Sequence, residues 1–385
     1  MRVAIDARPA LDARKTGVGY YAQHLIHALP HADPDTEYVA WYLHAKGVFR
    51  PRRFFAAAEA PNLSEKGTPF PARLFEPLST RAGVPKLEWF CDFDVVLATN
   101  YLPPATASLG VVMMVHDLAF RLFPETAPHT DGRWRRRFRR WLDDAARLLV
   151  PSEATRRDLI DLYGVDGSRV DVVHHGVDAD AFRPAPDRAV EEVRARYRIA
   201  GPYLFFVGGI EPRKNLGGLV RAFAGLGEGA SLVIAGGPVR WFPKAAAQLD
   251  AQIDSLPSSV RRRIVRTGYV SDADRLALLT GARAFVYPSR YEGFGMPVLE
   301  AMACGIPVLT SEVSSLPEVA GDAALLVDPD DTEGLAAAMR QMLDDVDLTE
   351  RLSASGLVRA AEFTWMRTAK QTAQALHRAA ETVRV

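Results

Sequence analysis

Two glutamates and a glycine-containing loop lie close together in the segment 287–310 of this 385-residue chain. Glu292 and Glu300 are separated by seven residues in the sequence YEGFGMPVLE, where Pro297 suits the first turn of a helix. At the start of that helix, where the helix dipole favours an anion such as a diphosphate, three backbone amides would point outward: Phe294, Gly295 and Met296. Carboxylates repel phosphate but readily accept hydrogen bonds from sugar and ribose hydroxyls. This pattern favours a ligand site over a plain strand–loop–helix with two surface glutamates.

Arg213 and Lys214 follow another apolar run, in the sequence FFVGGIEPRKN. A strand, a turn at Gly208 and Gly209 and the start of a helix would place both cations at the carboxyl edge of a sheet, where open α/β sheets bind ligands. Arginine offers a planar fork and lysine a point charge, which together suit a leaving diphosphate. The helix dipole disfavours two merely solvated cations at this position, which also favours a function.

Short apolar runs that alternate with segments of helical period must position these residues. This order predicts doubly wound parallel sheets. A chain of 385 residues fits two domains of about 180 to 200 residues each, and the proline-rich segment 178–190 is the predicted linker. The predicted strands are residues 3–5, 95–97, 111–115, 148–150, 203–207, 232–235, 264–265, 284–287 and 307–309.

Composition excludes several classes of protein. Lys+Arg and Asp+Glu are equal at 47 each, so no net charge attracts nucleic acid. Two cysteines, Cys91 and Cys304, can form neither a disulfide framework nor a cysteine zinc site, and they suit a reducing compartment. No apolar run reaches the length of about 18 residues that spans a membrane, and MRVAIDARPA lacks a signal-peptide pattern. We therefore expect a cytoplasmic protein.

Seven segments, in a fixed order, resemble the retaining glycosyltransferases of family 4, which have the GT-B fold. They are IDARPALDARKTGVGYY, VHDLAF, VPSEATRRDL, VVHHGVD, VGGIEPRKN, GYVSDAD and the block with the two glutamates. The resemblance covers most of the chain. It implies an α/β protein with two Rossmann-like, doubly wound parallel-sheet domains facing a cleft. Residues 1–182 would bind the acceptor and residues 190–364 the nucleotide sugar, and a helix at 365–385 would pack back onto the first domain.

The resemblance also implies roles for single residues. Glu300 would bind the ribose hydroxyls and Glu292 the hydroxyls of the donor sugar, while Arg213 and Lys214 would bind the diphosphate. His116, after the strand 111–115, would lie beside the donor sugar, so the implied catalytic residues are His116, Arg213, Lys214 and Glu292. The implied donor-binding residues are Gly17, Gly19, Gly209, Val270, Phe294, Gly295, Met296 and Glu300. His175 departs from the family, in which asparagine is more usual.

Two rival motifs are weaker. Residues 17–22 match the dinucleotide fingerprint G-x-G-x-x-A, but ten residues separate Asp6, at the end of the strand, from Gly17. Asp-x-Asp pairs, the metal signature of the other large glycosyltransferase fold, recur too often along the chain to be informative. No clustered His/Cys spacing indicates zinc. We expect no cofactor and no metal.

Six arginines surround an apolar stripe in residues 132–145, GRWRRRFRRWLDDA. The stripe consists of Trp134, Phe138, Trp141, Leu142 and Ala145, at helical spacing. Either the segment Arg133–Trp141 contacts an anionic bilayer, or the stripe packs into the domain and leaves a solvated basic face. A second basic and aromatic segment, 49–55, could serve lipid or acceptor.

The expected function is transfer of a sugar from a nucleoside diphosphate sugar to an acceptor hydroxyl, with retention of configuration. The wording of the motifs resembles bacterial mannosyltransferases of surface polysaccharide synthesis, which favours GDP-mannose over UDP-sugars. The acceptor would be a lipid-linked or growing oligosaccharide at the inner face of the cytoplasmic membrane. The alternatives are a GT-B epimerase acting on a UDP-sugar and a transferase with a UDP-sugar donor. A catalytically silent binding protein would lack the charged cluster that this chain keeps.

Overall fold

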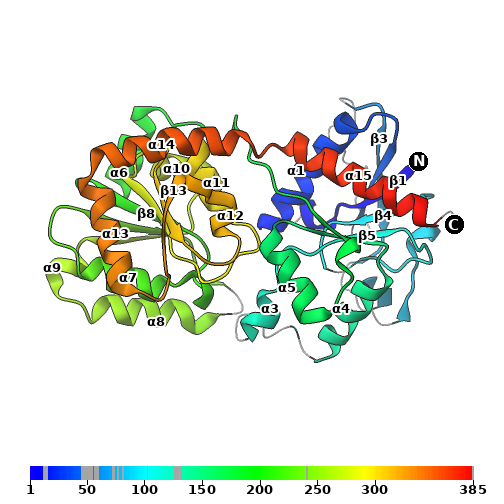
Figure 1. Ribbon diagram of the computed structural model, residues 1–385, viewed down its shortest axis with the longest axis horizontal. Coiled ribbons are helices and arrows are strands. Elements are labelled where there is room, and N and C mark those ends of the chain that lie inside the picture. Colours follow the sequence, from blue (N-terminus) through cyan, green and yellow to red (C-terminus); the bar gives the residue numbers. More distant parts are fainter. Residues whose placement is uncertain are drawn as a thin grey trace. The chain divides into compact units, whose positions relative to one another are not determined.

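The chain forms two compact units in a computed structural model (Figure 1). The described residues are 1–11, 16–44, 55, 60–71, 74–75, 78–79, 82–101, 103–124, 130, 132–239 and 242–383. Unit 1 comprises Met1–Leu118, Thr130–Gly176 and Thr364–Val385, and unit 2 comprises Ala119–His129 and Val177–Phe363. The chain therefore enters unit 2 briefly between 118–119 and 129–130, enters it again at 176–177 and returns to unit 1 at 363–364.

The predicted linker, residues 178–190, belongs to unit 2. Val177 and Phe182 pack on the apolar core of that unit, and the amide of Ala185 donates a hydrogen bond to Thr280 Oγ1 at 2.9 Å. The segment whose prolines and charges suggested a linker is thus held on the surface of unit 2.

Unit 1 contains a seven-stranded parallel sheet in the order β3-β2-β1-β4-β5-β6-β7. Its strands are β1 Arg2–Asp6, β2 Glu37–His44, β3 Leu63–Pro69, β4 Val95–Ala98, β5 Val111–Met114, β6 Arg147–Val150 and β7 Val170–Val172. Its helices are η1 Arg8–Leu11, α1 Gly17–Ala32, η3 Leu87–Trp89, α4 Gly132–Asp144, α5 Glu153–Tyr163, η5 Gly167–Arg169 and α15 Trp365–Val383. The sequence did not predict β2, β3 or β7. Strand β3 lies at the sheet edge and buries only Leu63 and Thr68, so it lacks the apolar run of a central strand.

Unit 2 contains a six-stranded parallel sheet in the order β10-β9-β8-β11-β12-β13. Its strands are β8 Tyr203–Val207, β9 Ser231–Ala235, β10 Ile264–Gly268, β11 Ala284–Tyr287, β12 Val308–Ser311 and β13 Ala324–Val327. Its helices are α3 Ala119–Leu122, α6 Asp187–Tyr197, η6 Pro212–Lys214, α7 Leu216–Ala224, α8 Pro243–Asp254, α9 Ser258–Arg261, α10 Asp272–Thr280, α11 Met296–Ala303, α12 Leu316–Ala320, η7 Gly321–Ala323, α13 Thr332–Asp344 and α14 Val346–Ala361. From β8 the strand order runs outward through β9 and β10, and from β11 it runs in the opposite direction. The strand order therefore reverses between β8 and β11, and such a switch point is where open α/β sheets bind ligands. The prediction of doubly wound parallel sheets is confirmed in both units, although β13 was missed.

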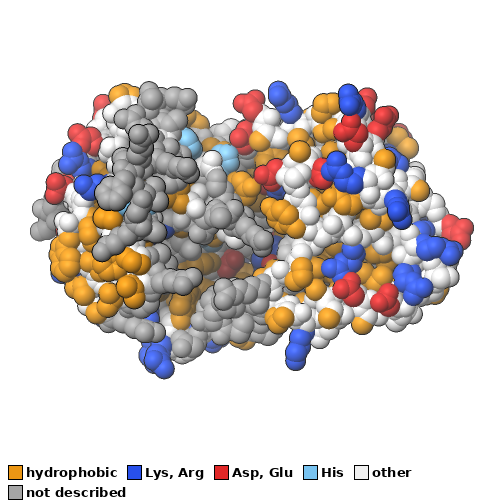
Figure 2. Space-filling model, turned by 180° about the vertical axis from the view of Figure 1, so that it is seen from behind, with side chains coloured by type: hydrophobic (Ala, Val, Ile, Leu, Met, Phe, Trp, Pro, Cys, Tyr) orange, Lys and Arg blue, Asp and Glu red, His pale blue; other side chains and the backbone are white. Residues whose placement is uncertain are grey.

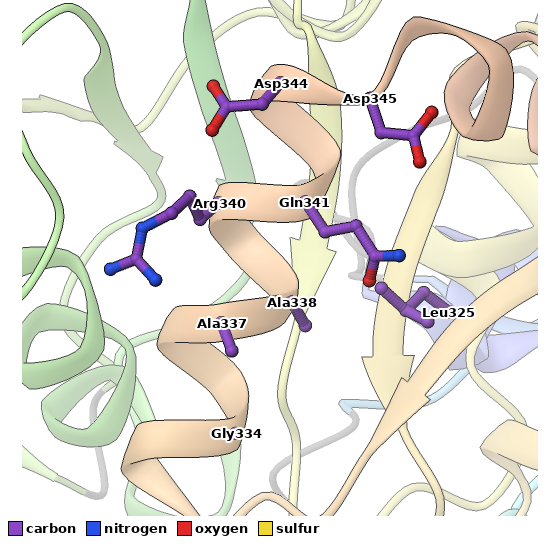
Figure 3. Close-up of a pocket in the computed structure, with 8 residues that line it drawn as sticks. All are labelled: Leu325, Gly334, Ala337, Ala338, Arg340, Gln341, Asp344 and Asp345. Atoms are coloured by element: carbon purple, nitrogen blue, oxygen red, sulfur yellow. The ribbon is translucent and has the colours of Figure 1, made fainter.

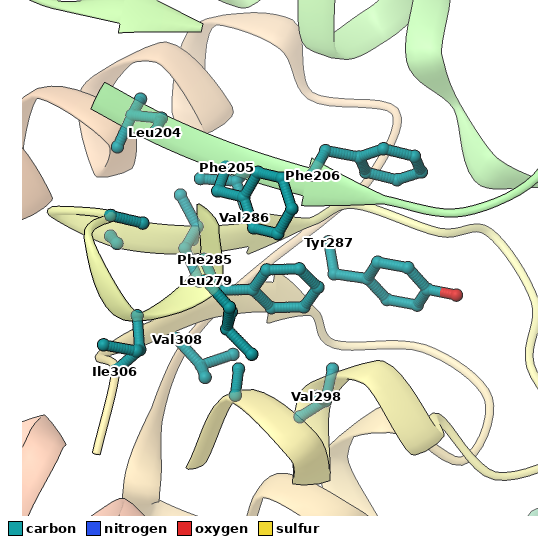
Figure 4. Packing of buried hydrophobic residues seen from close by; sticks show 14 of the residues in the cluster. Leu204, Phe205, Phe206, Leu279, Phe285, Val286, Tyr287, Val298, Ile306 and Val308 are labelled. Atoms are coloured by element: carbon teal, nitrogen blue, oxygen red, sulfur yellow. The ribbon is translucent and has the colours of Figure 1, made fainter. Parts of the chain in front are cut away.

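Four aromatic residues pack among aliphatic side chains in the core beneath this switch point (Figure 4). Phe205, Phe206, Phe285 and Tyr287 are fully buried because helices cover both faces of the sheet. The ring of Tyr287 stacks on Phe206 and Phe285, each with a centroid distance of 5.6 Å. Its hydroxyl points away from the apolar side chains shown in Figure 4. One residue thus belongs both to the core and to the polar edge of the sheet.

Helix α15 completes unit 1, where it lies along α1 (Figure 1). Ala369, Ala373, Leu376 and Ala380 recur at helical spacing and are buried in the same apolar cluster as residues of α1. Thr368 Oγ1 also donates a hydrogen bond to the carbonyl of His174 at 2.7 Å. The return of the chain after unit 2 is therefore an integral part of the unit 1 core.

Across the described helices, none is both long enough and apolar enough to cross a membrane.

Candidate functional site

The loops that follow β8 and β11 are joined at the switch point of unit 2. The amide of Arg290 donates to the carbonyl of Arg213 at 2.7 Å, and Ser289 Oγ lies 3.1 Å from the same carbonyl. Parallel strands end at one edge of a sheet, so residues nearly eighty positions apart in the chain become neighbours. The two segments that the sequence singled out separately therefore form one structure.

The carboxylate of Glu292 lies at the centre of this structure. Its Oε2 accepts a hydrogen bond from Arg213 Nη1 at 2.7 Å. Its Oε1 accepts from Lys214 Nζ at 2.5 Å, Ser289 Oγ at 2.7 Å and the hydroxyl of Tyr287 at 3.0 Å. Only 9% of the Glu292 side chain is exposed. We call these five residues the Glu292 network.

Arg213 and Lys214 also have contacts beyond the carboxylate of Glu292. Arg213 Nη2 pairs with Glu211 Oε1 at 3.0 Å, and its Nη1 donates to the carbonyl of Tyr291 at 2.9 Å. The ammonium of Lys214 lies 4.8 Å from the ring centroid of Tyr287, within the range of a cation–π contact. The predicted diphosphate ligands and the predicted sugar ligand are thus paired with each other in this structure.

Burial and pairing have opposite effects on the network's charges. Burial alone would raise the pKa of Glu292, but the two cations outweigh it and lower that pKa to about 2. Burial and the neighbouring Arg213 lower the pKa of Lys214, while burial and Glu292 raise that of Tyr287. The carboxylate faces two cations, whereas Lys214 is repelled by the neighbouring Arg213. The pairing therefore stabilises ionised Glu292 more than it stabilises protonated Lys214.

Two serines that the sequence did not single out hold the backbone of the Glu292 loop. The amide of Glu292 donates to Ser314 Oγ at 3.1 Å. Ser315 Oγ lies 2.8 Å from the carbonyls of both Glu292 and Phe294, which share its single proton. Ser314 has a φ of 61°, which is an unusual conformation for a residue other than glycine. Nothing in the sequence indicates this conformation.

Helix α11 begins at Met296, as the predicted anion site requires, with Pro297 in its first turn. Gly295 precedes it with a φ of 109°, and a Cβ there would lie 2.8 Å from Leu316 Cδ2. Phe294, Gly295 and Met296 therefore lie at the N-terminus of α11, directly after the Glu292 network. The position must be glycine for both conformational and steric reasons.

Glu300 lies further along α11 and pairs with a residue that the sequence did not single out. Its Oε2 is 3.0 Å from Arg275 Nη1 of α10. Burial raises the pKa of Glu300 to about 7, although Arg275 acts in the opposite direction. A cation in the first turn of a helix is disfavoured by the helix dipole, and this misfit was the available signal for Arg275.

Two other predicted residues of unit 2 follow β8 and β10, the strands on either side of β9. Gly209 comes after β8, and a Cβ there would lie 2.6 Å from Val239 Cγ2. Val270 is buried between β10 and α10. Gly236, after β9, approaches the carbonyl of Gly208 so closely that a Cβ would lie 1.9 Å away. The loops after β8 and β9 therefore pack backbone against backbone at Gly208 and Gly236.

His116, Gly17 and Gly19 belong to unit 1. His116 Nε2 lies 2.9 Å from the carbonyl of Thr99, and because a carbonyl only accepts, Nε2 carries the proton and Nδ1 the lone pair. Burial lowers the pKa of His116, which favours this neutral form. Gly17 and Gly19 lie in the first turn of α1. His116 can thus accept a hydrogen bond from a hydroxyl group.

His175 lies beside His116, with 5.7 Å between the ring centroids. Burial and the neighbouring His116 lower the pKa of His175 well below its usual range. Its ring also contacts Tyr21 and Trp365, at centroid distances of 4.6 Å and 6.2 Å. Where the family more usually has asparagine, His175 therefore places an aromatic ring against His116.

The arginine-rich helix α4 has the two faces that its sequence predicts. Phe138 and Leu142 are fully buried in unit 1, and Trp134 stacks on Phe138 at a centroid distance of 5.3 Å. Arg133 and Arg136 are exposed. The apolar stripe is therefore mainly part of the core, although Trp134 and Trp141 are only half-buried, and the basic face is exposed. Residues 49–54 of the second basic segment lie outside the described residues.

The volumes of the surface hollows do not identify the site. A groove of about 610 Å³ lies along α13, and Figure 3 shows Arg340 and Gln341 of that helix pointing to opposite sides. It includes no predicted site residue. A smaller hollow of about 250 Å³ is lined by Glu211, Pro212 and Arg290, next to the Glu292 network. Convergent polar groups and perturbed pKa values therefore favour the network as the functional site.

Comparison with known proteins identifies the family of the chain. Residues 190–357 match the family "Glycosyl transferases group 1", and residues 15–181 match "Glycosyltransferase Family 4". The O-antigen chain mannosyltransferase B of Escherichia coli is 35% identical over 270 residues, which cover 69% of each chain. The chain belongs to glycosyltransferase family 4. The resemblance predicted from the sequence is confirmed.

Other relatives of this family 4 glycosyltransferase match shorter parts of their own chains. The D-inositol 3-phosphate glycosyltransferase of Kineococcus radiotolerans is 34% identical over 258 residues, or 62% of this chain and 59% of the relative. The serotype-specific mannosyltransferase WbdA of E. coli is 30% identical over 227 residues, 58% of this chain and only 27% of WbdA.

Solved structures show that the fold is GT-B. The crystal structure of Anabaena Alr3699/HepE in complex with UDP-glucose aligns with a TM-score of 0.72 at 17% identity, over 98% of this chain and 99% of HepE. The lipopolysaccharide glycosyltransferase WaaG aligns with a TM-score of 0.65 at 17% identity, over 97% and 99% of the two chains.

Proposed function

We propose that this glycosyltransferase moves mannose from GDP-mannose to a hydroxyl of a lipid-linked or growing oligosaccharide, with retention of anomeric configuration. The Glu292 network carries the proposal, because it places two cations and a carboxylate directly before the N-terminus of α11. These are the groups that a diphosphate and a sugar hydroxyl would each bind.

The names of the relatives support mannose as the sugar and surface polysaccharide as the product. Both E. coli relatives are mannosyltransferases, and one acts on an O-antigen chain. The second candidate donor is a UDP-sugar, because HepE has been crystallised with UDP-glucose. The fold alone does not distinguish the two bases.

The reaction would break the bond between C1 of the sugar and the phosphate oxygen. The acceptor oxygen would bond to C1 from the same face, and its proton would pass to the departing phosphate. Arg213 and Lys214 would stabilise the negative charge that develops on the diphosphate, in a buried site where such stabilisation is strong. Glu292 opposes the loss of the Lys214 proton, because it raises the pKa that burial lowers.

The other predicted residues would bind the donor. The amides of Phe294, Gly295 and Met296 would receive the phosphate at the start of α11. His116 Nδ1 would accept a hydrogen bond from a sugar hydroxyl, since Thr99 fixes its tautomer. We propose that no divalent metal is needed, because the basic pair supplies the charge that a metal would otherwise provide.

We also propose that the basic face of α4 contacts an anionic membrane surface. Arg133 and Arg136 are exposed on this face, and a hollow of about 620 Å³ beside it is lined by Lys86, Arg137 and Trp141, among others. Figure 2 shows hydrophobic side chains gathered on the surface of unit 1. The exposed large hydrophobic residues of unit 1 include Trp89 and Leu109. Basic and amphipathic side chains together suit the interface of a bilayer.

A donor screen tests the function. Purified protein would be incubated with GDP-mannose, UDP-glucose, UDP-N-acetylglucosamine or ADP-glucose, each with and without a mannosylated lipid acceptor. We expect GDP release only with GDP-mannose and acceptor together, and NMR of the product should show the α-anomer of the donor retained. Conversion of a UDP-sugar without any acceptor would establish the epimerase alternative instead.

A further inference from the structure

Three contacts hold the guanidinium of Arg275 in unit 2. Its Nη1 lies 3.0 Å from Glu300 Oε2, its Nη2 lies 3.6 Å from Asp272 Oδ1, and its Cζ lies 5.1 Å from the ring centroid of Phe182. Its buried Nε has no hydrogen-bond partner within the described part of the chain. Arg275 is therefore fixed mainly by a carboxylate on either side and by an aromatic ring, and Glu300 is the acceptor within hydrogen-bond distance.

The contact divides the Glu300 carboxylate into two different oxygens. Oε2 is held by Arg275, whereas Oε1 receives no hydrogen bond from any residue that the structure describes. A carboxylate on a long side chain with only one fixed oxygen has a defined direction, which an unpaired glutamate would lack because of its rotamer freedom. The positive charge of Arg275 also favours ionised Glu300 against the effect of burial.

We propose that Arg275 is a positioning residue for the ribose of the nucleotide. It holds Oε2 of Glu300 so that Oε1 is presented to the ribose hydroxyls. Arg275 makes no contact with the nucleotide itself; it acts through Glu300. The inference rests on the proposed function and on the ribose role that the family resemblance implies for Glu300. It adds the residue that makes Glu300 competent for that role.

The test compares a nucleotide with its analogue that lacks the ribose hydroxyls. Isothermal titration calorimetry would measure binding of GDP and of 2′,3′-dideoxy-GDP to the full-length protein, with UDP and its dideoxy analogue used if UDP binds more tightly. Arg275→Gln should weaken GDP binding about tenfold, at the lower end of the effect of removing a hydrogen bond to a charged group. It should change dideoxy-GDP binding less than twofold. Arg275→Lys should retain most of the GDP affinity because it keeps a cation beside Glu300.

Arg196→Gln is the matched control. Arg196 of α6 pairs with Asp274, which lies on α10 next to Arg275, and 54% of the Arg196 side chain is exposed. The substitution therefore removes an ion pair of α10 without touching Glu300. It should leave the affinity of both nucleotides unchanged. Thermal unfolding of each variant would confirm that unit 2 remains folded.

Equal weakening of GDP and dideoxy-GDP in Arg275→Gln would overturn the inference, because Arg275 would then support the fold or contact another part of the nucleotide. Unchanged GDP binding in Arg275→Gln would also overturn it. If the wild-type protein binds both analogues equally, the ribose role of Glu300 is wrong and the inference falls with it, while the donor screen still decides whether the protein transfers sugar. Acceptor-dependent transfer combined with either of the first two results would leave the proposed function intact.

Discussion

Substituting Glu292 by glutamine should destabilise unit 2 much more than unit 1. The change removes the negative charge that lies between Arg213 and Lys214, and it leaves these two cations buried. The pKa of Glu292 falls from its ordinary value of 4.5 to about 2, and a shift of that size corresponds to about 3 kcal/mol of stability. Breaking a buried ion pair by removing one partner costs about 3–5 kcal/mol, which is consistent with this figure.

The sign of this contribution is set by the direction of the pKa shift. The folded-state pKa of Glu292 is depressed, so its contribution is present above the ordinary value of 4.5 and is lost as the pH falls toward about 2. At neutral pH the wild-type protein therefore has the full benefit, and the difference between wild type and Glu292→Gln should be largest there. In acid the difference should shrink.

Hydrogen exchange measured by mass spectrometry at neutral pH can test each unit separately. A loss of about 3 kcal/mol should accelerate exchange of the slowest amides in β8 and β11 by about 100-fold, while those of β1 and β5 remain unchanged. Glu211→Gln is the matched control, because Glu211 forms an ion pair with Arg213 and its removal leaves Glu292 in place. Its effect should be smaller.

A double variant separates loss of charge balance from loss of a hydrogen bond. Adding Lys214→Met to Glu292→Gln removes the cation that has no ion pair with Glu211, and it should restore more than half of the lost protection. Exchange in β8 and β11 that stays within threefold of wild type in Glu292→Gln would refute the pairing argument. Failure of the double variant to recover would refute the charge-balance explanation.

The other predictions concern the ligands and the membrane. Glu300→Ala should raise the donor KM about tenfold or more with little change in kcat, because the ribose does not change charge as the sugar leaves; steady-state kinetics showing mainly a kcat loss would place Glu300 at the sugar. Nucleotide affinity should rise from about pH 6 to about pH 8, since burial raises the pKa of Glu300 to about 7 and the ionised carboxylate is the better acceptor; a flat calorimetric profile would contradict this. Activity should survive exhaustive EDTA treatment, and loss that Mg²⁺ or Mn²⁺ restores would show that the basic pair is insufficient. Flotation with anionic vesicles should fall as salt rises from about 0.1 M to about 1 M, where the Debye length shrinks from about 10 Å to about 3 Å, and it should weaken in Arg133→Glu/Arg136→Glu; binding that neither change affects would rule out the basic face of α4.

The parts of the site that depend on local sequence could be predicted, and the parts that depend on distant pairing could not. Pro297 and Gly295 indicated where α11 begins, and the structure places it there. The pairing of Glu292 with Arg213 joins residues 79 positions apart, so it exists only once β8 and β11 are adjacent in the sheet. The residue types at both positions were visible in the sequence, but their mutual neutralisation was not.

The fold shows the same division. Fully buried strands such as β8 and β11 have continuous apolar runs and were predicted, whereas the edge strand β3 has the sequence LSEKGTP and was not. The stripe on α4 was equally compatible with a membrane and with a core, because helical periodicity does not identify what the apolar face contacts. Burial of Phe138 required the packing of unit 1 to be known.

The position of α15 imposes an order on the assembly of the protein during synthesis. Translation proceeds from the N-terminus, so all of unit 2 has been synthesised before α15 is available to cover α1. Until then the seven-stranded sheet of unit 1 lacks Ala369, Ala373 and Leu376 from its apolar cluster. Although most of unit 2 lies later in the sequence, all its segments are synthesised before unit 1 is complete. A chain truncated after Phe363 would retain every strand of both sheets, yet unit 1 would expose the surface that α15 buries.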